Sequence, residues 1–529
     1  MSPARRRYGS AVLSALLLTA AFPPFGFRFL GWVALVPWLT CLLRDRGEGH
    51  KGPGFVFGLV HFTTGLAWLF PLHPAFPVAL SSILALYPLL FAFLFRRVAR
   101  LGPEKAVLAM PFLWVGVDFL REHLASGFPW LLPGHVFAGY ANLRQAAALG
   151  GEHLLTFLLV FAAAAIAGWR VGTKFRWRML AAAVALPLVF TLQGSVARES
   201  MRDGAGPRVL LVQPNFEMAL KGQALKSDDP AAEMRNVQLA LSLDGIRLHP
   251  DIDIVVWAET MIPSRLRAKD RRRDIQDGDT TRRLLSIADP MGVVAGAPRR
   301  FLGGALILDP DLRERNAALL VGPEGRIEAR FDKVHLTPFG EYIPGLALLP
   351  ETARTTIEGW IREISPFIPD LAPGTSKSIP LDLAGGKRTV LGGLVCYEVL
   401  FPGLARERVQ EGAEVLVNLS NYGWYGRSVQ EQILDVTRLR AVETRRPVVV
   451  ATSSGPTCIL DGNGETRFSI PPGERGALYA EVPLDGRDSP YASTGEVVAW
   501  LSAALGLVAA AAGAAAGRKR SPEMGRETS

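Results

Sequence analysis

One segment of the chain offers a carboxylate that could act as a general base. Glu259 follows Ile254–Trp257, a short apolar, β-branched run of the kind that forms a buried strand. A carboxylate at the end of such a strand, partly removed from water, is suited to accepting a proton from a nucleophile. Taken alone, a glutamate in this position is more typical of a salt bridge or a helix cap.

A second segment carries a positive charge and another carboxylate, Lys333 and Glu341. A lysine ammonium is a compact charge that can hold a thiolate or stabilise a developing oxyanion. Taken alone, the two residues are more typical of a solvated ion pair.

A third segment contains a candidate nucleophile, Cys396, at the end of the apolar run Val390–Val395 and before Pro402. This pattern is typical of a strand that turns into a helix, where backbone amides and a nearby lysine are expected to lower the pKa of the thiol. Taken alone, it is more typical of an inert buried cysteine. Cys41 and Cys458 are interpreted as structural thiols, and three cysteines cannot build a disulfide framework.

Other kinds of chemistry find little support. The sequence has no phosphate-binding P-loop, no G-x-S-x-G turn and no His-Glu-x-x-His pair, and its eight histidines are scattered. We therefore expect no metal at the active site and no cofactor.

The region that must position these residues alternates short β-branched runs with longer polar stretches of helical spacing. This alternation predicts an α/β domain over residues 205–490. The expected strands are 209–212, 254–257, 292–297, 390–395, 415–419 and 448–451, and the expected helices are 231–248, 271–288 and 429–445.

The rest of the 529-residue chain is far more apolar, and the mean hydropathy is +0.21. Residues 1–195 are expected to form a membrane domain of about seven spans, and 495–517 a final span before a cytoplasmic tail, 518–529. The apolar runs are 9–22, 29–43, 54–72, 78–95, 106–120, 153–169, 179–192 and 497–516.

Charge predicts how these spans are oriented. Most of the net charge of +9 comes from basic residues in alternate short loops of the apolar part, whereas residues 201–492 hold slightly more acidic than basic side chains. The positive-inside rule places the basic loops in the cytoplasm and the α/β domain on the outer side. The same distribution argues against a nucleic-acid partner, and the lipid bilayer is the expected partner.

Together, Glu259, Lys333 and Cys396 resemble the Glu-Lys-Cys triad of the nitrilase (carbon-nitrogen hydrolase) superfamily. The N-terminal region, with Pro24-Phe25-Gly26 and Gly127-Phe128-Pro129-Trp130, resembles the apolipoprotein N-acyltransferase family of the bacterial inner membrane. The resemblance implies a polytopic α-helical membrane domain plus an α/β nitrilase-type αββα sandwich that faces the periplasm.

The resemblance also implies an activity. A fatty acyl group would pass from a membrane phospholipid to Cys396 as a thioester, and then to the N-terminal amine of a diacylglyceryl-cysteine lipoprotein, the diacylated apolipoprotein. Supporting active-site positions matched by the family are Glu341, Asn316, Tyr397 and Glu398, and expected substrate or lipid contacts are Trp424 and Trp130.

The sequence departs from the family's usual residues at Gly222, Tyr422, Ile433 and Val450. These changes affect recognition of the incoming amine more than the triad. Two alternatives therefore stay open: a membrane-tethered nitrilase-type amidase or an acyltransferase acting on a different amine, and a membrane scaffold without activity.

Overall fold

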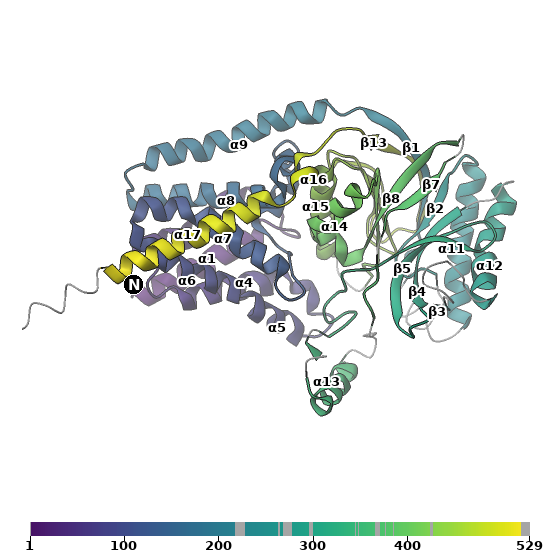
Figure 1. Cartoon of the computed structure of the whole chain (residues 1–529), viewed down its shortest axis with the longest axis horizontal. Coiled ribbons are helices and arrows are strands. Elements are labelled where there is room, and N and C mark those ends of the chain that lie inside the picture. Colours follow the sequence, from purple (N-terminus) through teal and green to yellow (C-terminus); the bar gives the residue numbers. More distant parts are fainter. Residues whose placement is uncertain are drawn as a thin grey trace, which may run out of the picture. The chain divides into compact units, whose positions relative to one another are not determined.

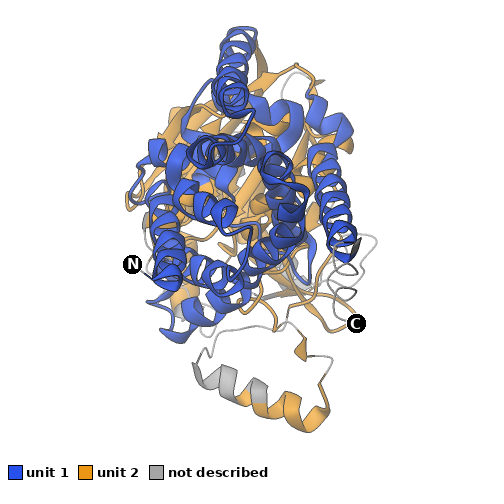
Figure 2. Cartoon of the chain, turned by 90° about the vertical axis from the view of Figure 1, so that its left-hand side faces the viewer, with its two compact units in different colours: residues 1–200, 434–439, 489–529 blue, residues 201–433, 440–488 orange. Residues whose placement is uncertain are grey.

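The computed structural model divides into two compact units. Unit 1 comprises residues 1–200, 434–439 and 489–529, and unit 2 comprises residues 201–433 and 440–488 (Figure 2). The structure describes residues 2–216, 228–262, 265–267, 278–295, 300–343, 345–346, 349–364, 371–375, 377–383, 386–423 and 427–519.

Unit 1 is built from helices, and each apolar run of the sequence falls on one or two of them (Figure 1). By length and composition, four described helical stretches could cross a membrane: Ala75–Leu101, Leu143–Val171, Arg176–Glu199 and Val497–Arg518. The predicted count of eight spans stays a prediction. The helices are α1 (Pro3–Ala20), α2 (Gly31–Ala34), α3 (Val36–Arg44), α4 (Lys51–Gly65), α5 (Ala75–Leu84), α6 (Leu86–Val98), α7 (Pro103–His123), α8 (Ala147–Val171), α9 (Arg176–Glu199), α16 (Pro490–Thr494) and α17 (Val497–Lys519).

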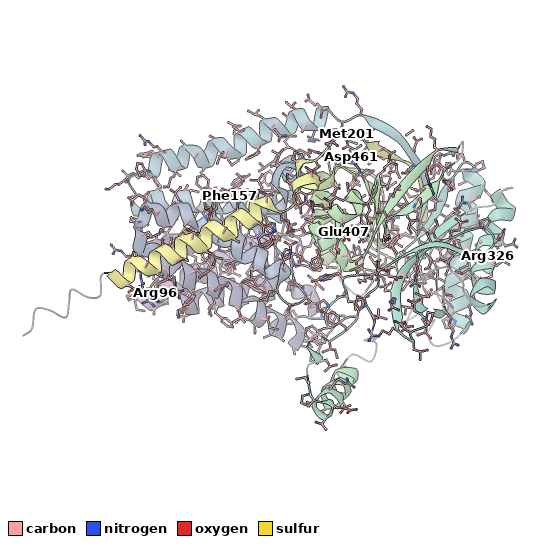
Figure 3. The ribbon with its side chains drawn as sticks, in the orientation of Figure 1. Arg96, Phe157, Met201, Arg326, Glu407 and Asp461 are labelled. Carbon is pink, nitrogen blue, oxygen red and sulfur yellow. The ribbon has the colours of Figure 1, made fainter. Side chains whose placement is uncertain are left out.

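Small residues and aromatic rings pack the helices of unit 1 closely. A Cβ atom on Gly116 of α7 would lie 2.9 Å from the Cα atom of Ala503 of α17, so only glycine permits this approach. One turn earlier in α7, the Phe112 ring lies edge-on to Phe157 of α8, with 5.0 Å between their centroids, and Figure 3 labels Phe157. The helices α7, α8 and α17 therefore form one packed group.

Unit 2 contains two sheets. In the described residues, a seven-stranded sheet has the order β13-β1-β2-β4-β5-β6, with β3 beside β4, and a six-stranded sheet has the order β12-β11-β10-β9-β8-β7. The strands are β1 (Asp203–Gln213), β2 (Ile254–Trp257), β3 (Arg265–Arg267), β4 (Arg300–Leu308), β5 (Glu314–Val321), β6 (Ile327–Asp332), β7 (Ile379–Asp382), β8 (Arg388–Val395), β9 (Val415–Ser420), β10 (Val448–Thr452), β11 (Thr457–Leu460), β12 (Thr466–Ile470) and β13 (Gly476–Asp485).

The sheets pack face to face, and helices cover their outer faces. Side chains such as Leu211 and Phe331 from one sheet share a buried core with Val395 and Val417 from the other. The sheets approach so closely at Gly393 that a Cβ atom there would overlap the Phe331 ring. The outer layers include α11 (Asp228–Leu248) and α12 (Gly278–Ala295) on one side and α14 (Pro402–Gln410) on the other, and the further helices are α13 (Glu351–Ile364) and α15 (Arg427–Thr444). This is the expected αββα sandwich.

One predicted element is wrong. Residues 292–295 of the predicted strand 292–297 end the helix α12, and 296–299 lie outside the described residues. The buried residues Leu284, Ile287, Ala288 and Met291 repeat with helical spacing up to the predicted strand. A short apolar run cannot by itself distinguish a strand from a buried helix end, so the helix 271–288 was predicted to end too early, and its residues 271–277 lie outside the described residues.

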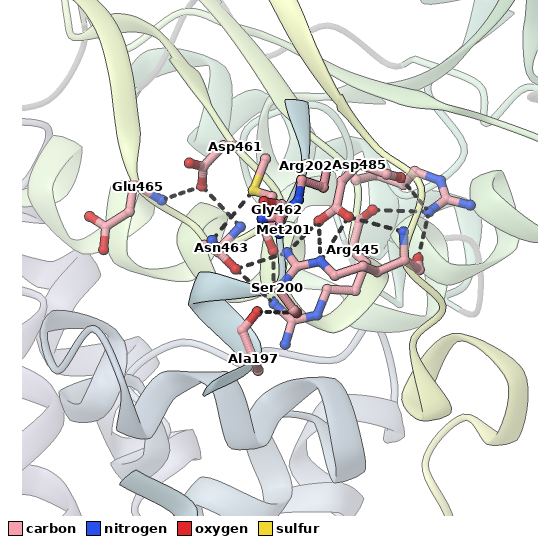
Figure 4. A network of polar contacts seen from close by, with 12 residues as sticks. Ala197, Ser200, Met201, Arg202, Arg445, Asp461, Gly462, Asn463, Glu465 and Asp485 are labelled. Atoms are coloured by element: carbon pink, nitrogen blue, oxygen red, sulfur yellow. Dashed lines mark hydrogen bonds and ion pairs between the residues drawn. The ribbon is translucent and has the colours of Figure 1, made fainter. Parts of the chain in front are cut away.

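A polar network joins the two ends of unit 2 (Figure 4). The strands β1 and β13 pair in antiparallel fashion with Asp203 opposite Asp485. Nearby, Arg445 donates a hydrogen bond to the Gly462 carbonyl at 3.1 Å, and Asn463 contacts the Met201 sulfur at 3.3 Å. The chain therefore enters and leaves unit 2 at neighbouring points.

Candidate active site

The structure brings the three candidate segments of unit 2 together. Glu259 follows β2, Lys333 directly follows β6 and Cys396 directly follows β8, so the first two come from one sheet and the third from the other. The side chains of Glu259 and Lys333 are buried, and Cys396 is partly buried. The Cys396 thiol is close enough to both that their charges alter its pKa.

Each of the three segments contains a non-glycine residue in the left-handed backbone region. The φ angles are +51° at Thr260, +59° at Phe339 and +53° at Cys396. A positive φ costs free energy for such residues and persists only where the surrounding structure enforces it. At Cys396 it turns the chain sharply between β8 and the 3₁₀ helix Cys396–Leu400, as expected of a nucleophile held on a strand-to-helix turn.

Lys333 and Asn316 join the two carboxylates of the site. The Lys333 Nζ lies 2.8 Å from Glu341 Oε2 and 3.8 Å from Glu259 Oε1. The Asn316 amide, on β5, donates hydrogen bonds to Glu259 at 2.8 Å and to Glu341 at 2.9 Å. An ammonium therefore already occupies the position between the carboxylates that a metal ion would take, and the site is organised around charged side chains of the protein.

Electrostatics hold the lysine in its charged form. Burial, the largest single effect, lowers the pKa of Lys333, but the charges of Glu341 and Glu259 together outweigh it and raise that pKa above its usual value. For Glu341, burial raises the pKa, whereas the Lys333 charge and hydrogen bond lower it below its usual value. The pair is ionised at neutral pH.

The pKa of the Cys396 thiol differs in direction from the one that the sequence predicts. Burial raises the pKa of Cys396 to about 12, and the Glu259 charge adds to this effect. The Lys333 charge and a hydrogen bond from the Asn421 backbone lower it, but by less. The expected lowered pKa is therefore wrong for the protein without substrate, because burial and an adjacent carboxylate outweigh one ammonium. Cys396 is therefore a neutral thiol at neutral pH, and such a thiol can act as a nucleophile only if a base removes its proton.

The Glu398 side chain accepts hydrogen bonds from backbone amides of the site. Its Oε1 accepts hydrogen bonds from the amides of Val334 at 2.7 Å and His335 at 2.9 Å, and its Oε2 accepts one from Val395 at 2.7 Å. The carboxylate thus joins the segment after Lys333 to the strand that ends at Cys396. These contacts predict that Glu398 positions the two segments, a role that its place beside the cysteine in the sequence did not show.

Glu398→Gln is expected to lower both stability and turnover. A glutamine keeps one acceptor oxygen and turns an NH₂ group toward a backbone donor, and a hydrogen bond to a charged group contributes about 1.5–3 kcal/mol. We expect a lower Tm and a lower kcat, with KM unchanged within about twofold because no substrate contact is lost. The matched control is Glu324→Gln, since the Glu324 side chain is 77% exposed. A normal kcat for Glu398→Gln would contradict a positioning role.

The other candidate residues lie in different surroundings. Tyr397 is buried and packs edge-on against Phe401, with 5.2 Å between ring centroids. Trp130 lies in unit 1, where it is 5% exposed and packs against Trp68; its contact with lipid stays a prediction. Trp424 and Gly222 lie outside the described residues.

Two further residues belong to the site. The motifs did not single out Thr337, and they marked Tyr422 only as a departure from the family's usual residue. The Thr337 hydroxyl accepts a hydrogen bond from Lys333 Nζ at 3.2 Å, and its amide donates one to Glu341 Oε2 at 2.8 Å. Tyr422 is buried, and that burial is the largest effect that raises its pKa. A neutral phenol therefore lies near the Cys396 thiol. Ile433 and Val450, the other two departures, are also buried.

Comparisons with known proteins cover both parts of the chain. A family model for the apolipoprotein N-acyltransferase N-terminal domain matches residues 14–165, and a carbon-nitrogen hydrolase model matches residues 222–489. The apolipoprotein N-acyltransferase of Geobacter metallireducens is 33% identical over 533 residues, which cover 96% of this chain and 95% of that protein. The corresponding protein of Vibrio vulnificus is 28% identical, with 95% and 96% covered.

Among solved structures, a nitrilase-superfamily protein from Saccharomyces cerevisiae is similar to this chain, with a TM-score of 0.38 and 18% identity. The match covers 56% of this chain and 96% of that one. The sequence matches, which extend through both units, confirm the resemblance seen in the motifs. The chain belongs to the apolipoprotein N-acyltransferase family.

Proposed function

We propose that this chain transfers a fatty acyl group from a membrane phospholipid, through a thioester on Cys396, to the N-terminal amine of a diacylglyceryl-cysteine lipoprotein. The observation that carries the proposal is the neutral Cys396 thiol beside Glu259 and Lys333 in a member of this family. A thioester divides one difficult acyl transfer into two easier steps.

In the first step, Glu259 removes the thiol proton as the sulfur attacks the ester carbonyl of the phospholipid. The developing oxyanion is stabilised by the Lys333 ammonium, which Glu341 and Asn316 hold in place through the contacts described above. Collapse of the tetrahedral intermediate forms the Cys396 thioester, and the proton passes from Glu259 to the departing lysophospholipid oxygen.

In the second step, the free amine of the lipoprotein attacks the thioester. Glu259 accepts a proton from the amine, the carbon–sulfur bond breaks, and the proton returns to the Cys396 sulfur. An amide and the free enzyme result, so atoms and charges balance over the cycle. A site that excludes water would favour the amine over hydrolysis.

We further propose that the protein lies in the bacterial inner membrane with unit 2 on the periplasmic side. The basic loops between apolar runs support this orientation by the positive-inside rule. Unit 2 receives and releases the chain at neighbouring points, which suits a domain held at a membrane by two tethers. Both substrates carry acyl chains, so the reaction requires such a position.

The test is the intact mass of the Cys396 peptide after the full-length protein is incubated with phosphatidylethanolamine and then with a diacylated lipopeptide. We expect an acyl adduct on Cys396 that moves to the lipopeptide amine. An adduct that disappears with release of free fatty acid, leaving the lipopeptide unmodified, would favour a hydrolase. Transfer only to a different amine would favour the alternative acyltransferase. No adduct with any phospholipid would contradict the proposed chemistry.

A further inference from the structure

We propose that unit 1 contains a binding site for a divalent transition metal such as Zn²⁺, formed by Glu122, His123, His153 and Glu496. Ligand atoms of Glu122, His123 and Glu496 all lie within 4.8 Å of one another. The His153 Nε2 lies 3.5 Å from Glu122 Oε2, which brings a second imidazole to the group. Two imidazoles and two carboxylates are a donor set that Zn²⁺ accepts in proteins.

Three packed helices bring these residues together. Glu122 and His123 end α7, His153 lies near the start of α8, and Glu496 immediately precedes α17. The close approach of α7 and α17 at Gly116 fixes the spacing of two of these helices. The three segments that hold these residues are far apart in the sequence, so no metal motif of regular spacing predicts the site.

The distances fit metal ligands better than hydrogen bonds. His123 Nε2 lies 3.5 Å from Glu496 Oε2, the same separation as in the His153–Glu122 pair. A charged N–H···O hydrogen bond is shorter, about 2.7–2.9 Å. By contrast, two ligands bound at about 2.0–2.1 Å in a tetrahedron are separated by about 3.4 Å. Both pairs therefore have the spacing of tetrahedron edges.

A hydrogen bond to the backbone orients the His123 imidazole so that one ring nitrogen can bind a metal. Its Nδ1 lies 3.0 Å from the Phe119 carbonyl oxygen, so Nδ1–H donates a hydrogen bond and the lone pair remains on Nε2, which faces Glu496. Orientation of a ligating histidine by a carbonyl is a common feature of metal sites. The Phe119 ring also packs against both imidazoles, with centroid distances of 4.3 Å to His123 and 5.9 Å to His153.

Charge also favours a cation here. The side chains of Glu122 and Glu496 are only 3% and 12% exposed, and Glu496 Oε1 is buried and accepts no hydrogen bond within the described part of the chain. The neighbouring Arg121 instead pairs with Asp118 at 3.2 Å and donates to the Trp130 carbonyl at 2.6 Å. Two carboxylates in poorly hydrated surroundings are stabilised by a divalent ion.

A second cluster of possible metal ligands in unit 1 serves as a comparison. Cys41, Asp45 and His50 satisfy the same distance criterion. There, however, Arg6 and Arg7 contact the Asp45 carboxylate at 2.6 and 2.7 Å. A metal would have to displace two guanidinium groups, so we assign no metal to this group, and His50 becomes the matched control.

The experiment measures zinc bound to the full-length protein in detergent, by mass spectrometry of the metal after equilibration with Zn²⁺ and gel filtration. We expect about one Zn²⁺ per chain and a Tm that Zn²⁺, but not Mg²⁺, raises by several degrees. His123→Ala and Glu496→Gln are expected to lose both effects. Because the His123 side chain is 50% exposed, its replacement leaves the packing of α7 intact.

His50→Ala is expected to keep both effects, and Cys396→Ala, which removes a competing thiol, is expected to keep them as well. Zinc content that is unchanged in both His123→Ala and Glu496→Gln would overturn the proposal. So would a wild-type protein that retains no zinc after equilibration at about 10 μM Zn²⁺, a concentration well above the dissociation constants of structural zinc sites. Neither result would bear on the acyl transfer proposed for unit 2.

Discussion

Cys396→Ala is expected to abolish acyl transfer and to leave no acyl adduct on the protein. The substitution removes the only atom of the site that can form a thioester, and loss of a covalent nucleophile lowers kcat by about 10⁴-fold or more. The fold should tolerate the change, because alanine fits the space of the partly buried thiol. The measurement is the initial rate of lipopeptide acylation in detergent micelles, together with the intact mass of the protein after incubation with phosphatidylethanolamine.

The chain offers matched controls, since its other two cysteines are also free thiols. Cys41 lies in α3 of unit 1 and Cys458 in β11 of unit 2, and both are buried. Cys41→Ala and Cys458→Ala are expected to retain acylation within about twofold, as substitutions away from the reacting atoms usually do. Adduct formation that survives Cys396→Ala and disappears in Cys458→Ala would place the nucleophile elsewhere.

The fold class could be predicted because alternation of short β-branched runs with helical stretches carries through most of unit 2. β2, β8, β9 and β10 coincide with predicted strands, since each is a continuous buried run. The sandwich itself came from the family resemblance. The strands β4, β5 and β6 were missed, although β4 and β5 are buried along almost their whole length. Glycine and arginine interrupt their apolar pattern, and their pairing depends on contacts with distant residues.

The sequence predicted which residues form the candidate site, but it predicted less about the role of each residue. The motifs named Glu259, Lys333 and Cys396, and the structure brings all three together. The positioning role of Glu398 depends on backbone amides from two separate segments, which no spacing in the sequence reveals. The raised pKa of the Cys396 thiol likewise depends on burial and on the balance of three neighbouring charges, and both are properties of the folded chain.

Lys333→Met is expected to have the second largest effect, and it should reduce both activity and stability. Methionine keeps the length of the side chain but removes the charge, leaving Glu259 and Glu341 as two buried carboxylates that share hydrogen bonds from Asn316. Loss of one partner from a buried ion pair costs about 3–5 kcal/mol. Loss of oxyanion stabilisation lowers kcat by about 10²–10³-fold. The measurements are thermal unfolding of the full-length protein and the rate of acylation.

A second substitution separates these two effects. Lys333→Met combined with Glu341→Gln removes one of the two unbalanced charges, so much of the lost stability should return, whereas the rate should stay low because no cation faces the reacting carbonyl. Lys377→Met, at an exposed lysine of the same unit, is the charge-matched control and should change neither quantity. If the double variant recovered its rate together with its Tm, Lys333 would serve only to balance buried charge. If stability returned while the rate stayed low, the ammonium would act directly on the reaction, as the placement of Lys333 between Glu259 and Glu341 predicts.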